Sequence, residues 1–223
     1  MTAMDWFPLY LSIKVAVSAT LVTLVLGLPL AWLLARGDFP GRELLDAVAT
    51  MPLVLPPSVL GYYLLVVLGR EGLIGRFLEE TMGISLVFTW QGAVIAASIV
   101  ALPLLVKTAV AALESVDPEL ESAARTLGRS DIAVLFTITI PLAWRGIVAG
   151  VVLAFARALG DFGATLLVAG NIPGKTQTMA VAIYDAIQAG NSELANFLVL
   201  VMTVFAFGTL LILNRLNRVV RRR

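Results

Sequence analysis

Side chains that could do chemistry are few in this sequence, and two common kinds are absent. The 223 residues contain no His and no Cys, which excludes thiol nucleophiles, disulfides, Cys/His zinc sites, His-ligated haem and imidazole general bases. Charged residues make up 14% of the chain and hydrophobic residues 59%, whereas soluble domains have about 25% and about 45–50%. The composition therefore predicts an integral membrane protein, and a net charge of +1 excludes nucleic acid as a partner bound through bulk charge.

Arg157 and Asp161 are charged residues inside an apolar stretch, where ionisable groups are costly and often functional. Their i, i+4 spacing would let them pair on one helix face. They could form an outer gate or a pathway element, or an ion pair that orients the turn Gly160–Thr165. An intramembrane aspartyl enzyme does not fit, because Ala158-Leu159-Gly160-Asp161 lacks the first Gly of the required motif and a second membrane Asp is absent.

These residues must be positioned by membrane spans, and we expect about five. Four uncharged stretches reach the roughly 20 residues that a bilayer requires: Val15–Ala35, Ala47–Leu68, Ile84–Val106 and Leu194–Leu213. A fifth span is expected to start near Pro141 and to continue past Arg157. In the second stretch, Pro56 and Pro57 could form a gate or pathway element, or a structural kink.

The distribution of basic residues predicts the orientation. With the N-terminus outside, ten Lys and Arg residues lie inside and three outside, as the positive-inside rule requires. The inside count depends partly on a basic C-terminal tail, which contains Arg215, Arg218, Arg221, Arg222 and Arg223. We also expect an amphipathic outer segment at Thr176–Ala189.

The cytoplasmic loop at about residues 113–131 is predicted to contain a short helix. Asp117 is a suitable N-cap with Pro118 at the first position, and Gly128 is a suitable stop about ten residues later. Ala123, Ala124 and Leu127 are expected to form a flat apolar stripe. Such a face suits docking into a groove of another protein, although a helix lying on the bilayer is the alternative.

The loop resembles that of the inner-membrane subunits of ABC importers. Ala123-Ala124 is followed after three residues by Gly128, and after nine more by Ile138-Thr139-Ile140-Pro141. The general pattern has Glu where Ser122 stands, and here Glu121 lies one position earlier. Further segments resemble the molybdate permeases of this family: Asp38–Asp46, Pro52–Pro57, Gly69–Gly75, Leu120–Gly128, Ala154–Thr165 and Asn171–Gly174.

The resemblance implies a single permease domain over residues 1–223, all-α, with the type I ABC importer fold and a cytoplasmic coupling helix. It implies a multi-pass subunit of a prokaryotic cytoplasmic (inner) membrane that works as a homodimer with two cytoplasmic ABC ATPase subunits and a periplasmic or extracellular oxyanion-binding protein. The implied coupling residues are Glu121, Ala123, Ala124, Leu127 and Gly128. The resemblance implies no catalysis and no cofactor in this chain, because the partner ATPases bind ATP and Mg.

Three questions stay open at this point. Tungstate, sulfate or thiosulfate could replace molybdate, because relatives for sulfate and thiosulfate share the same plan. A membrane assembly subunit without transport activity is a remote alternative. The third question is which residues line the pathway, for which Pro56, Pro57, Arg157 and Asp161 are the candidates.

Overall fold

The computed structural model describes the backbone of residues 6–221 and the side chains of residues 6–211. Within this range the chain is helical and forms no strand. In chain order the elements are α1 (Phe7–Arg36), α2 (Arg42–Val54), α3 (Pro57–Leu68), α4 (Leu73–Met82), α5 (Trp90–Glu114), α6 (Pro118–Thr126), α7 (Asp131–Val134), a π-helical turn (Leu135–Thr139), α8 (Ile140–Leu159), α9 (Gly163–Ala169), α10 (Met179–Gln188) and α11 (Ser192–Arg221).

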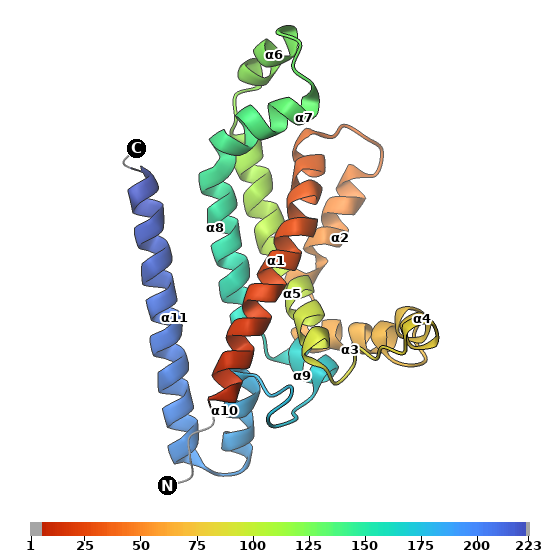
Figure 1. Cartoon of the computed structure of the whole chain (residues 1–223), viewed down its shortest axis with the longest axis vertical. Coiled ribbons are helices and arrows are strands. Elements are labelled where there is room, and N and C mark those ends of the chain that lie inside the picture. Colours follow the sequence, from red (N-terminus) through yellow and green to blue (C-terminus); the bar gives the residue numbers. More distant parts are fainter. Residues whose placement is uncertain (1–5, 222–223) are drawn as a thin grey trace.

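Four helical segments of the described chain are long and apolar enough to cross a membrane. They are α1, α5, the run Asp131–Leu159 that ends in α8, and residues Ser192–Leu211 of α11. A fifth pass requires α2 and α3 to be counted together. Figure 1 shows α1, α5, α8 and α11 running between two ends of the molecule, with α6 and α7 at one end and α9 and α10 toward the other. The all-helical architecture with about five apolar passes is therefore confirmed.

The second predicted span is not one continuous helix. The axes of α2 and α3 differ by 115°, and the break lies at Leu55 and Pro56, whose ψ angles are both 138°. A residue before proline is driven out of the helical region, and proline itself has no N–H to continue the hydrogen-bond ladder. Two successive prolines, Pro56 and Pro57, therefore end α2 and begin α3 in a new direction.

The other spans match their predicted stretches with shifted ends. α5 begins at Trp90 rather than Ile84, because Gly83 and Phe88 have positive φ angles and Thr89 caps the helix by accepting a hydrogen bond from the Gly92 N–H. α8 begins at Ile140, beside the expected start at Pro141.

Helix α5 lies at the centre of the core, with α1 and α8 packed against it. Small residues allow this close approach, as is common between membrane helices. A Cβ added at Gly146 of α8 would lie 2.3 Å from the Ala112 Cβ of α5, and one at Gly27 of α1 would lie 2.9 Å from a Leu105 methyl carbon. The two helices that flank the α6 loop, α5 and α8, are thus held in direct contact.

Helix α11 lies at the side of the bundle, where it packs mainly against α10 (Figure 1). The predicted outer segment contains α10, which lies at the end opposite α6. The side chains of the basic C-terminal tail lie outside the described residues, so the orientation that depends on them stays a prediction.

Candidate functional site

Helix α6 forms as the loop sequence predicts. The Asp117 carboxylate accepts a hydrogen bond from the Glu119 N–H at 2.9 Å, and Pro118 occupies the first turn. The helix has nine residues and is followed by Gly128 with φ 81°. A left-handed residue after the last turn is a common helix stop, and glycine adopts it without a Cβ penalty. The helix and its stop are therefore confirmed.

The predicted apolar stripe is divided between two faces of α6. Ala124 is buried against the rest of the chain, on the same side as Glu121. Ala123 faces outward with Leu120 and Leu127, which are 49% and 85% exposed. The spacing i, i+3, i+7 places these three on one helix face. The expectation that Ala123 and Ala124 share one face was wrong, because Ala124 follows Glu121 by three residues and turns inward with it.

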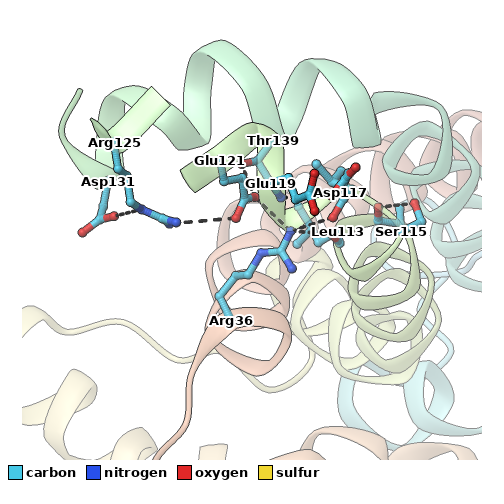
Figure 2. Close-up of polar contacts among 11 residues, drawn as sticks. Arg36, Leu113, Ser115, Asp117, Glu119, Glu121, Arg125, Asp131 and Thr139 are labelled. Atoms are coloured by element: carbon cyan, nitrogen blue, oxygen red, sulfur yellow. Dashed lines mark hydrogen bonds and ion pairs between the residues drawn. The ribbon is translucent and has the colours of Figure 1, made fainter. Parts of the chain in front are cut away.

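Glu121 is the most buried charged residue of the loop, with a side chain 5% exposed. Its Oε1 accepts a hydrogen bond from Arg36 Nη2 at 2.9 Å and a second from the Thr139 hydroxyl at 2.7 Å (Figure 2). Arg36 is the last residue of α1, and Thr139 is the last residue of the π-helical turn. We call Arg36, Glu121 and Thr139 the Glu121 cluster.

Arg36 also contacts the end of α5. Its Nη2 donates to the Leu113 carbonyl at 2.9 Å and, more weakly, to the Val116 carbonyl at 3.4 Å. Carbonyl groups in the last turn of a helix have no intrahelical partner and carry partial negative charge, which favours a nearby cation. The guanidinium therefore joins the ends of α1 and α5 to the buried face of α6.

The other oxygen of the Glu121 carboxylate faces Arg125. The distance from Oε2 to Arg125 Nη2 is 3.8 Å, and Arg125 Nε donates to Asp131 Oδ1 at 2.7 Å (Figure 2). Asp131 is the first residue of α7. The chain of charges therefore continues from the loop helix into the segment that leads to α8.

Two of the candidate gate residues, Arg157 and Asp161, form an ion pair at a second place. Arg157 Nη1 is 3.4 Å from Asp161 Oδ1, and Asp161 Oδ2 accepts hydrogen bonds from the N–H and the hydroxyl of Thr165 at 3.0 and 2.8 Å. A Cβ at Gly163 would lie 3.2 Å from the Pro57 Cβ, so the α2–α3 break touches the start of α9. This geometry fits the interpretation in which the ion pair orients the Gly160–Thr165 turn.

Two residues of the Glu121 cluster were not identified from the sequence. Arg36 served only as a basic residue in the orientation count, and Thr139 only as a position between Ile138 and Ile140. The sequence did offer one signal for the cluster, because Thr139 is a polar side chain at the edge of a predicted span. The described residues contain no group of three or more Asp, Glu, His or Cys side chains that could hold a metal ion.

Comparison with known proteins agrees with this architecture. The chain is 48% identical to the molybdenum transport system permease protein ModB of Escherichia coli K12, over 100% of this chain and 98% of that protein. It is 42% identical to the putative molybdenum transport system permease protein YvgM of Bacillus subtilis, over 92% and 91%. Among solved structures, a chain of the inward-facing MetNI methionine ABC transporter matches with a TM-score of 0.75 at 17% identity, over 99% of both chains.

A chain from a bacterial ABC transporter involved in alginate import matches with a TM-score of 0.71 at 18% identity, over 94% of this chain and 78% of that chain. These likenesses identify the fold as that of type I ABC importer permeases. The model of the family described as binding-protein-dependent transport system inner membrane component matches residues 27–223. The chain therefore belongs to the family of inner membrane components of binding-protein-dependent transport systems.

Proposed function

We propose that this chain is the membrane-spanning permease subunit of an ATP-driven importer for molybdate. The observation that carries the proposal is the 48% identity with a molybdenum transport permease over the full length of both chains. Two copies of the chain would form the pathway. Two ATPase subunits would bind ATP and Mg, and a binding protein would deliver the anion. The complex would lie in the cytoplasmic membrane of a prokaryote.

The outward face of α6 would bind the ATPase subunit. Leu120, Ala123 and Leu127 form an exposed apolar stripe on α6. Figure 1 shows α6 at the tip of one end of the molecule. The helix carries acidic residues in its first turn, whereas helices that lie on a membrane surface normally have basic residues beside the apolar face. The exposed apolar stripe therefore fits a hydrophobic groove of another protein better than a membrane surface. The α6 end would then be cytoplasmic, as the basic residues predict.

The break between α2 and α3 and the adjoining α9 would lie near the outer gate. The Arg157–Asp161 pair would act there by fixing the start of α9, because an Arg already neutralised by Asp binds an anion weakly. Selection among oxyanions would occur largely in the binding protein, since molybdate, tungstate and sulfate are tetrahedral dianions of similar geometry.

Co-purification with the partner ATPase subunit of the proposed transporter tests the coupling role. Leu127→Lys should abolish co-purification, because it places a charge in the apolar stripe. Leu73→Lys is the matched control, since Leu73 is 89% exposed on α4, away from α6. Equal co-purification of both variants would contradict the assignment.

Titration of the neighbouring binding protein with molybdate, tungstate and sulfate tests the substrate. We expect molybdate to bind more tightly than sulfate. A preference for sulfate would assign the system to the sulfate branch. A preference for tungstate would make tungstate, rather than molybdate, the assigned substrate.

A further inference from the structure

We propose that the Glu121 cluster is the connection through which movement of α6 reaches α1 and α8 together. The proposal rests on the proposed function, because it takes the ATPase as the source of the movement. It assigns Arg36 and Thr139 as positioning residues and gives Glu121 a role inside the chain, on the face of α6 turned away from the exposed stripe.

The backbone of α6 packs on the two segments that follow it, α7 and the π-helical turn. Its connection to α1 is made by side chains, through the 2.9 Å contact between Arg36 and Glu121. Arg36 also holds the Leu113 carbonyl at 2.9 Å. A displacement of α6 would therefore move the ends of α1 and α5 as well as the segment that follows α6 in sequence.

The contact would be costly to break. Glu121 has a side chain 5% exposed and Arg36 one 22% exposed. Separating the pair leaves the buried carboxylate with only the more distant Arg125, 3.8 Å away, as a counter-charge. Hydrogen bonds to ionised groups are also shorter and stronger than neutral ones. The elements joined at Glu121 are therefore expected to move together.

The π-helical turn is the point at which the helical run from α7 to α8 can bend. It interrupts the otherwise α-helical run from Asp131 to Leu159, and π turns inside helices are often found at functional sites. Its last residue, Thr139, is 2% exposed and donates to the same Oε1 that Arg36 contacts. One carboxylate oxygen thus receives donors from α1 and from the start of α8.

The absence of cysteine allows the connection to be measured directly. Spin labels on Leu33→Cys in α1 and Ser122→Cys in α6 report the distance between the two helices. Arg36→Gln and Glu121→Gln should broaden or shift this distance distribution. Glu114→Gln is the matched control, because Glu114 pairs with Arg42 at the same end of the molecule but at 3.4 Å, with both side chains about half exposed. An unchanged distribution in Arg36→Gln would refute the connection.

The complete complex with ATPase and binding protein in proteoliposomes tests transmission. Arg36→Gln should retain the ATPase and hydrolyse ATP, but transport about fivefold less molybdate per ATP, a ratio in the range of ordinary allosteric coupling. Arg36→Lys should recover part of the lost transport per ATP, because Lys restores the positive charge but not the planar guanidinium group with its several donors. A purely structural role would lower hydrolysis and transport in parallel, and an unchanged ratio would overturn the proposal.

The two readouts distinguish failure of this inference from failure of the proposed function. A wild-type complex that binds no ATPase would refute the proposed function and the transmission role with it. The spin-label distances would still decide whether Arg36 holds α6 to α1.

Discussion

The contact between Gly146 and Ala112 allows a quantitative test of the close packing between α5 and α8, the two helices that flank α6. Gly146→Ala would place a new Cβ 2.3 Å from the Ala112 Cβ, whereas ordinary contacts lie at 3.4–4 Å. The two helices would have to separate by about 1 Å, and overpacking of this kind costs about 1–3 kcal/mol. Ala is favoured over Gly in a helix by up to about 1 kcal/mol, which offsets part of the loss.

A second glycine removes the helix-propensity contribution from the comparison. Gly208 lies in α11, and a Cβ there would meet no atom within 4 Å. Gly208→Ala therefore changes helix propensity without a clash. The difference in unfolding free energy between the two variants should equal the overpacking cost, about 1–3 kcal/mol.

Unfolding in mixed micelles by titration with dodecyl sulfate, followed by far-ultraviolet circular dichroism, measures this difference. Ala112→Gly combined with Gly146→Ala should restore stability, because it removes the other carbon of the clash. A Gly146→Ala variant as stable as Gly208→Ala would refute the close packing of α5 on α8. The same conclusion would follow if Ala112→Gly gave no rescue.

Three further predictions concern single contacts. Asp161→Ala should destabilise the protein by about 1–3 kcal/mol, because the buried Thr165 N–H loses its acceptor; Asp161→Asn should cost less in thermal unfolding, and equal losses would argue against this hydrogen bond. Gly128→Ala should speed amide exchange in α6, since a left-handed residue with a Cβ costs about 1–2 kcal/mol; unchanged exchange would contradict this. Lys107→Asp should weaken the contact between α2 and α5 by about 1 kcal/mol, and adding Asp46→Lys should restore it; no rescue would show that the pair is not formed.

The sequence is sufficient for the features that depend on local chemistry. The apolar lengths predict the membrane helices, and Asp117, Pro118 and Gly128 predict the start and stop of α6 within about a residue. The prolines indicate a kink or gate in the second span but not its size. The 115° change of direction depends on the packing of α3 against α9. In that packing Gly61 lies against Ala164, a tertiary contact that no local sequence pattern encodes.

The buried network around Glu121 could not be read from the sequence. Arg36 and Glu121 are 85 residues apart, and their pairing depends on how α1, α5 and the loop meet in space. The hydrophobic pattern of α6 was also ambiguous, because Ala123 and Ala124 are neighbours and only the burial of Glu121 decides which of them turns inward. Among the gate candidates, the i, i+4 spacing did predict the Arg157–Asp161 pair.

ATP-dependent uptake of radiolabelled molybdate tests the central claim most directly. The chain would be reconstituted with its neighbouring ATPase and binding protein in proteoliposomes, with the Leu127→Lys variant as the uncoupled control. We predict uptake that requires ATP and the binding protein, resists an equal concentration of sulfate and is lost in the control. Absence of ATP-dependent uptake by the wild-type complex, or uptake that the control variant retains, would contradict the account.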